Sequence, residues 1–181
     1  MRALVVYESM YGNTHIVASN IADGLRATHE VTAVPVAEAT SELVAAADLL
    51  VVGGPTHFHG MSRTSSRQKA RQAAAKPDSG LSLDPDADGP ALRDWLGGLG
   101  ERHMLAAAFD TRFNGAPIMT GRASRGIGSL LKRHGYHLVV APESFLIGKE
   151  NALLDGEASR ARRWGESLGA AATIAHVPAR G

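Results

Sequence analysis

Three apolar runs of strand length, each followed by a short polar segment, restrict this chain more than any other feature of its sequence. The runs are Ala3–Tyr7, Asp48–Gly53 and Met104–Phe109, and segments with helical periodicity follow them. Strands that alternate with helices predict βα units and a parallel sheet that is covered on both faces. The carboxyl ends of such strands meet at one edge of the sheet, where ligands bind in open α/β folds. We therefore expect the polar segments to share one site.

The rest of the chain continues this alternation. Strands are expected at residues 2–7, 30–36, 48–53, 103–109 and 136–147, and helices at 13–27, 40–46, 62–75, 90–98, 121–134 and 156–174. The last strand should be interrupted at Pro142, because proline cannot donate to a sheet ladder. The order predicts a three-layer α/β sandwich around a doubly wound, five-stranded parallel sheet. With no repeat or linker, residues 1–181 should form a single domain.

The first polar segment, Ser9–Thr14, has the properties of an anion-binding turn. It enters an expected helix, whose first N–H groups are free and carry a partial positive charge. Ser9, Asn13 and Thr14 add short side-chain donors, and Gly12 lets the backbone approach a ligand closely. The turn contains no Lys or Arg, so dipoles and hydrogen bonds would hold a phosphate. A polar turn of this kind also forms where it only caps a helix.

The second and third polar segments suit the other end of a ligand. Gly54–Gly60 and Asp110–Gly115 each carry one aromatic side chain, whereas Ser9–Thr14 carries small hydroxyl groups. That division fits a molecule with a phosphate at one end and a flat ring at the other.

The three segments together resemble the flavin loops of the flavodoxin-like family. Ser9–Thr14 resembles its phosphate loop, T/S-x-T-G-x-T; Gly53–Thr56 resembles the start of its second flavin loop; and Asp110–Phe113 occupies the place of the third. The spacing agrees over essentially the whole chain. The resemblance implies bound FMN and the strand order 2-1-3-4-5. The Ser-Met-Tyr-Gly form is more similar to the quinone-reductase branch than to the small electron carriers.

The resemblance also implies a set of cofactor-binding residues. Tyr11 stands where the electron carriers have Thr. In place of the carriers' Trp and Tyr, the ring would stack against His57 or Phe58 on one side and Phe113 on the other. The implied FMN contacts are Ser9, Met10, Tyr11, Gly12, Asn13, Thr14, Pro55, Thr56, His57, Phe58, Asp110, Thr111, Arg112 and Phe113.

Composition excludes several classes of function. The chain is 44% hydrophobic and has a formal net charge of +1, which favours neither a nucleic-acid partner nor an acidic docking face. It contains no cysteine, so disulfides and thiolate chemistry are excluded and the cytoplasm is the expected location. We expect no signal peptide and no membrane span. His57 and His59 alternate on an extended segment without a nearby carboxylate, so no metal site is expected.

The stretch 62–89 is longer than a crossover requires and forms an expected insertion. Arg63, Arg67 and Arg71 lie four residues apart on one face of its helix, and a turn-rich acidic segment follows. One interpretation is a solvated helix face with a mobile loop. The other is a cover over the flavin or a docking arm. Further along the chain, Arg122 and Arg125 lie at the start of an expected helix. They are either surface charges or ligands for a second phosphate, such as that of NADPH.

Three hypotheses of function follow. The chain is an FMN enzyme that reduces a quinone or similar acceptor with NAD(P)H, an electron carrier for a redox partner protein, or a flavodoxin-like binding domain that has lost FMN. The sequence identifies no catalytic residue. It also leaves the oligomeric state open, with a homo-oligomer among the alternatives.

Overall fold

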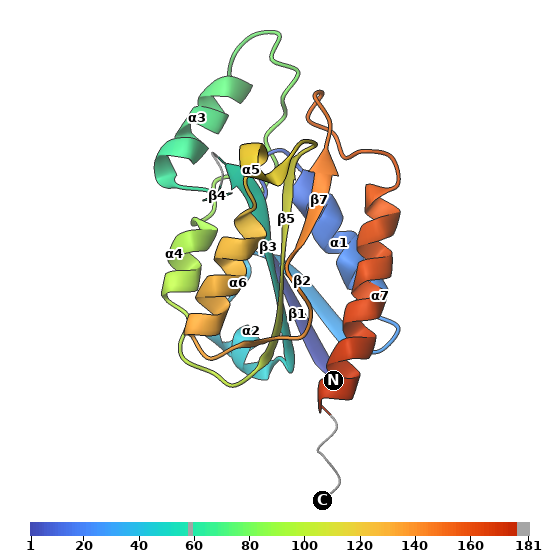
Figure 1. Cartoon of the computed structure of the whole chain (residues 1–181). Helices are drawn as coiled ribbons and strands as arrows, with labels where there is room; N and C mark the ends of the chain where they lie inside the picture. The colour runs from blue at the N-terminus through green and yellow to red at the C-terminus, as the bar shows by residue number, and fades with distance from the viewer. Residues whose placement is uncertain (58–59, 177–181) are drawn as a thin grey trace, which may run out of the picture.

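The computed structural model describes residues 1–57 and 60–176, and its elements alternate as the sequence predicts (Figure 1). The strands are β1 (Arg2–Tyr7), β2 (Glu30–Pro35), β3 (Leu49–His57), β4 (Gly60–Met61), β5 (Leu105–Phe113), β6 (His137–Leu138) and β7 (Glu143–Ile147). The helices are α1 (Asn13–Leu25), the 3-10 turn η1 (Val36–Glu38), α2 (Ser41–Ala46), α3 (Thr64–Ala74), α4 (Leu92–Gly97), α5 (Pro117–Thr120), α6 (Ala123–Arg133) and α7 (Glu157–His176). Within the described ranges, no helix has both the length and the hydropathy required to cross a membrane.

The sheet has the topology that the sequence predicts. Its order is β2-β1-β3-β5, and β6 and β7 both pair in parallel with β5. These two short strands are the expected fifth strand, and residues 139–142, which include Pro142, separate them. The five-stranded parallel core in the order 2-1-3-4-5 is thereby confirmed. The added element is β4, which pairs antiparallel with the end of β3 through Thr56 and Met61.

Two strands run further than expected, and the prediction that turns begin at Gly54 and Asp110 was wrong. Pro55 pairs with Thr111 across β3 and β5, and Thr111 pairs with Phe145 across β5 and β7. These pairings give the backbone hydrogen-bond partners beyond the apolar runs. The two expected ligand loops therefore begin as the paired ends of β3 and β5.

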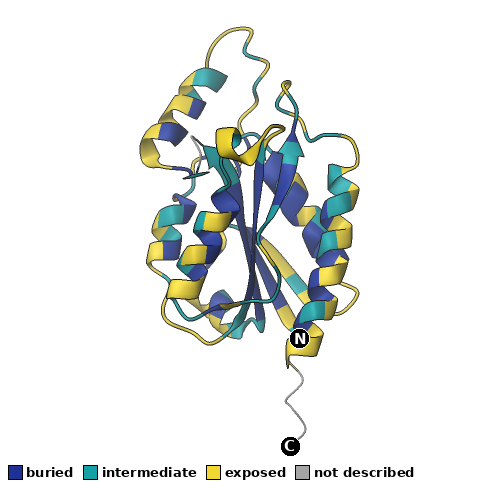
Figure 2. Cartoon of the chain, in the orientation of Figure 1, coloured by how far each residue is buried: buried dark blue, intermediate teal, exposed yellow. Residues whose placement is uncertain are grey.

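Two hydrophobic layers hold helices on the faces of the sheet (Figures 1 and 2). On one face, α1 and α7 pack against the central strands, and the expected stripe of Val17, Ile21 and Leu25 is fully buried. On the other face lie α2, α4 and α6, with Ile127 and Leu131 fully buried. The central strands β1, β3 and β5 are mostly buried on both faces, as an all-parallel core requires, whereas the edge strand β2 is partly exposed.

Helices α1 and α7 touch at glycine positions. A Cβ atom at Gly24 would lie 2.1 Å from the carbonyl oxygen of Arg162, and one at Gly165 would lie 2.3 Å from that of Ile21. Both distances are far below a van der Waals contact, so the two backbones approach only because these residues are glycine. This contact fixes α1, and with it the turn that precedes α1.

We expect Gly165→Ala to destabilise the protein by about 1–3 kcal/mol, the usual penalty for overpacking a close contact. The matched control is Gly97→Ala at the end of α4, where a Cβ would meet nothing within 4 Å. Urea denaturation followed by circular dichroism measures both changes. Equal free energies of unfolding for the two variants would contradict the close approach of α1 and α7.

Candidate functional site

A cavity of about 770 Å³ lies at the carboxyl ends of β1, β3 and β5. Its volume is within the range of roughly 300–1,000 Å³ usual for small-molecule sites. The predicted site residues that line it are Met10, Tyr11, Asn13, Thr14, Pro55, Thr56, His57, Thr111 and Phe113. The topology thus brings the three predicted segments together, as the position of strand ends in an open sheet requires.

The turn before α1 has the structure of an open helix N-terminus. Gly12 is the N-cap with φ +88°, a conformation that favours glycine, and its N–H donates to Ser9 Oγ at 3.1 Å. The N–H of Ile16 donates to the carbonyl of Gly12, so the N–H groups of the preceding helical residues have no acceptor within the helix. The hydroxyl of Thr14 lies 2.8 Å from that of Thr111. Ser9 itself is buried beneath the turn.

The loop after β7 adds polar groups to the same end of the cavity. Lys149 and Asn151 both line it, and Asn13 Nδ2 donates to the carbonyl of Asn151 at 2.8 Å. The sequence analysis missed both residues, and no local motif marks them. Free N–H groups, the Thr14 hydroxyl and one ammonium group are suitable donors for a phosphate. These residues therefore fit the phosphate of FMN.

The cavity is also lined by rings and apolar side chains. His57 and Phe113 line it, and Phe113 is half-exposed. Burial, reinforced by Arg67 and opposed by Glu8, lowers the pKa of His57, so its imidazole is neutral at pH 7. Met119 of α5, which the sequence analysis did not identify, also lines the cavity. Phe58, the other predicted stacking residue, lies outside the described residues.

Asp110 is not among the residues that line the cavity. It is fully buried, and its carboxylate accepts the N–H of Ser124 at 2.6 Å, while Thr56 Oγ1 accepts that of Ala123 at 2.9 Å. The two side chains thus bind the N-terminus of α6. Burial raises the pKa of Asp110. Asp110 is a positioning group for the wall of the site.

Two arginines that the sequence analysis weighed as ligands fasten loops. Arg112 donates to the carbonyls of Phe113 and Gly115 and to Thr120 Oγ1, which closes the connection between β5 and α5. Arg122 donates to Ser144 Oγ and to the carbonyl of Pro142, both at 3.1 Å.

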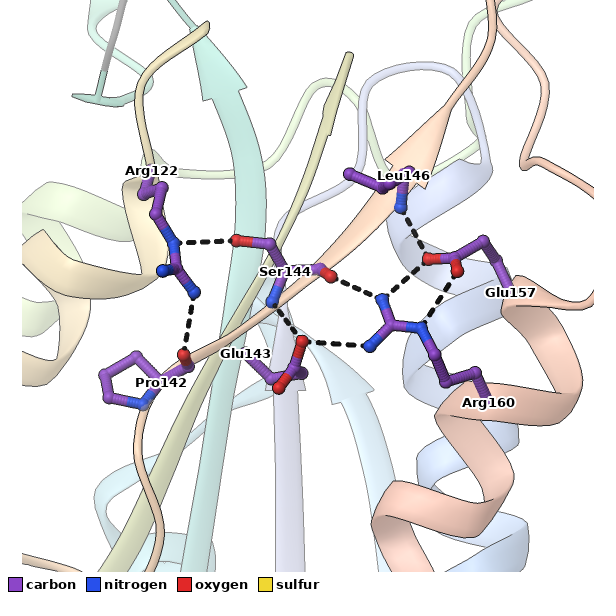
Figure 3. A network of polar contacts seen from close by, with 7 residues as sticks. All are labelled: Arg122, Pro142, Glu143, Ser144, Leu146, Glu157 and Arg160. Atoms are coloured by element: carbon purple, nitrogen blue, oxygen red, sulfur yellow. Dashed lines mark hydrogen bonds and ion pairs between the residues drawn. The ribbon is translucent and has the colours of Figure 1, made fainter. Parts of the chain in front are cut away.

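Figure 3 shows that Arg122 belongs to a structural network. On the other side of Ser144, Arg160 bonds to Glu143 and Glu157, and Glu157 accepts the N–H of Leu146. The network ties β7 to α6 and α7, so the donors of Arg122 are used away from the cavity.

The expected insertion at 62–89 is closed on itself by Arg67 and is bound at Asp84 to the turn before α1. Arg67 is only 5% exposed and donates to the carbonyls of Ala87 and Gly89 at 2.8 and 2.6 Å. The N–H of Asp84 donates to the carbonyl of Met10 at 2.9 Å. The interpretation of the arginine face as solvated was therefore wrong for Arg67. Ser79 and Leu81 line the cavity between these anchors.

A buried carboxylate joins the insertion to β1. Glu8 is only 3% exposed. Its carboxylate accepts a hydrogen bond from the Ser62 hydroxyl at 2.5 Å and another from the N–H of Leu92 at 2.7 Å. Its Oε1 also lies 3.8 Å from Nε of Arg67. Two hydrogen bonds and a nearby guanidinium offset the burial of its charge.

A second polar cluster fastens the same loop to α1. His15 Nδ1 lies 3.4 Å from Asp84 Oδ2, and the Tyr7 hydroxyl donates to Asp86 Oδ2 at 3.2 Å. The ligand atoms of His15, Asp84 and Asp86 all lie within 4.8 Å of one another. These contacts hold the loop beside the turn that leads into α1, and they account for the cluster.

Comparison with known proteins relates this chain to a family. A family model described as Flavodoxin matches residues 5–105. One similar solved structure is a flavodoxin from the domain Archaea, which is 17% identical with a TM-score of 0.64; the match covers 96% of this chain and 99% of that chain. Another is Flavodoxin 1 from Bacillus cereus, which is 17% identical with a TM-score of 0.63; the match covers 98% of this chain and 99% of that chain. A WrbA-like flavodoxin from Agrobacterium tumefaciens is 22% identical, with a TM-score of 0.55 and coverage of 96% and 98%. A search of curated proteins finds no match.

We expect Thr14→Ala to weaken FMN binding by about 1–2 kcal/mol, the loss typical of a hydrogen bond to a charged group. Flavin fluorescence titration of the apoprotein measures the dissociation constant. Thr173→Ala is the matched control, because that hydroxyl bonds to the carbonyl of Gly169 within α7. Unchanged affinity in a Ser9/Thr14 double alanine variant would show that the phosphate binds elsewhere.

The anchors at Arg67 and Asp84 restrict the predicted mobility of the insertion to the segment between them. We expect thermolysin to cut the native protein first before Leu81 or Leu83, between the anchors at Arg67 and Asp84. Arg67→Gln should accelerate that cut, because the loop loses its guanidinium bonds, whereas Arg163→Gln on the exposed face of α7 should not. Mass spectrometry of the fragments locates the site. A first cut within α1 or α7 would contradict the prediction.

Proposed function

Because this chain belongs to the flavodoxin family, whose members bind FMN and transfer electrons, we propose that it is an oxidoreductase that passes electrons from NAD(P)H to a quinone-type acceptor. Bound FMN supplies one- and two-electron transfer, and the chain supplies position and surroundings. The absence of cysteine favours the cytoplasm as the place of this reaction.

The exposed apolar side chains at the open end of the cavity carry this proposal. Phe113 is 51% exposed and Met119 is 73% exposed, and both line the cavity. Large apolar side chains that gather at an open site mark a binding surface. A flat, weakly polar acceptor fits this surface.

The polar end of the cavity would fix the orientation of the cofactor. The N-terminus of α1, the Thr14 hydroxyl and Lys149 would hold its phosphate, and the ring would then extend toward His57 and Phe113. A neutral His57 offers a hydrogen bond there without adding a charge.

A specific observation favours an electron carrier as the second candidate. Ile118 of α5 is 90% exposed but does not line the cavity. An apolar side chain beside the open end, directed outward, suits a protein partner better than a small acceptor.

We expect the FMN-loaded protein to oxidise NAD(P)H in the presence of 1,4-benzoquinone. Met119→Ser should raise the KM for the quinone about fivefold, which corresponds to losing about 1 kcal/mol of apolar contact. Ile174→Ser is the matched control, because Ile174 is 76% exposed on α7.

A different result would identify the carrier. If the loaded protein consumes no NAD(P)H with the quinone, but reduces cytochrome c after chemical reduction with dithionite, the proposed enzyme activity fails and the second candidate is supported.

A further inference from the structure

A second cavity, of about 300 Å³, adjoins the cofactor cavity. The two share His57, Ser66 and Lys69 as lining residues. The smaller cavity lies between the start of α3 and α4, which neighbour each other on one side of the sheet (Figure 1). Its volume suits one polar group of a larger molecule whose remainder lies in the cofactor cavity.

The charge of the smaller cavity is positive. Arg63, Lys69 and Arg93 line it, and none of the described lining residues is acidic. Arg63 is the N-cap of α3, and Ser65 and Ser66 of the first helical turn also line the cavity. Two guanidinium groups, an ammonium group and a helix N-terminus thus surround one small volume, and each of them attracts an anion.

The Arg93 side chain is a further feature of the cavity that suits an anion. Its Nε is buried and has no hydrogen-bond partner among the described residues. The positive charge of the guanidinium lies beside the cavity, and an anionic ligand there would balance it. The planar guanidinium matches the oxygens of a phosphate better than those of a neutral group.

We propose that the smaller cavity binds a phosphate group of the electron donor, a reduced nicotinamide dinucleotide. The inference rests on the proposed function, because it supplies the donor's binding subsite. With its phosphate between Arg63 and Arg93, the donor enters the cofactor cavity across the boundary formed by His57, Ser66 and Lys69. The insertion at 62–89 then determines which donor the protein accepts.

Calorimetric titration of the FMN-loaded protein with NADP⁺ and NAD⁺ tests this subsite without turnover. We expect Arg93→Gln and Arg63→Gln each to raise the dissociation constant of NADP⁺ about tenfold or more, as for the loss of a charged hydrogen bond. Arg163→Gln on α7 is the matched control and should change nothing. Arg63 is exposed, so its variant tests the proposal even if Arg93→Gln fails to fold.

The pattern of losses identifies the phosphate. If the variants weaken the binding of NADP⁺ alone, the cavity holds the 2′-phosphate. If they weaken the binding of NADP⁺ and NAD⁺ equally, it holds the diphosphate. If the wild type oxidises NAD(P)H but neither variant changes the binding of either nucleotide, the subsite is refuted while the proposed function stands.

A wild type that oxidises neither nucleotide would refute the proposed function first. Inorganic pyrophosphate then tests the cavity alone. Binding that is lost in both variants supports an anion site, and the absence of binding to the wild type overturns it.

Discussion

The buried carboxylate of Glu8 is the group on which the walls of the site depend. Glu8 follows β1 directly and precedes the turn at Ser9–Thr14, and its two oxygens accept hydrogen bonds from Ser62 and from the N–H of Leu92. A buried charge is tolerated only with such partners, so the segments before α3 and at the start of α4 must meet the end of β1. One residue thereby joins the phosphate turn to both helices that line the smaller cavity.

The sheet and its covering helices could be predicted because their signals are local. A parallel strand buried on both faces appears as a continuous apolar run, as in residues 49–52, which are fully buried. The stripe of Val17, Ile21 and Leu25 likewise reveals one face of α1 without knowledge of its partner. The ends of β3 and β5 were misplaced because they depend on pairing with β4 and β7, which no local pattern reveals.

The walls of the site could not be predicted for the same reason. In the sequence, Arg67 looks like the exposed Arg63 one helical turn earlier. It is buried because the chain folds back over it and the carbonyls of Ala87 and Gly89 accept its hydrogen bonds. Asp110 was interpreted as a ligand contact, since a polar residue at a strand end looks alike whether it faces a ligand or caps the next helix. Lys149 lines the cavity from the loop after β7, far along the chain from the turn at Ser9–Thr14, and no sequence motif marks it.

The sheet and the additions to it have different parts in the proposed chemistry. Strand ends and the N-terminus of α1 come with the βα units, and they can place a flavin without specifying its substrates. The cations at Arg63 and Lys69 come from the insertion, and the apolar rim at Met119 comes from α5. Under the proposed function, the donor's phosphate and the acceptor's ring are recognised by different walls of one opening. Substrate choice then lies in segments that can change without disturbing the sheet, because function is carried by sites built onto a fold.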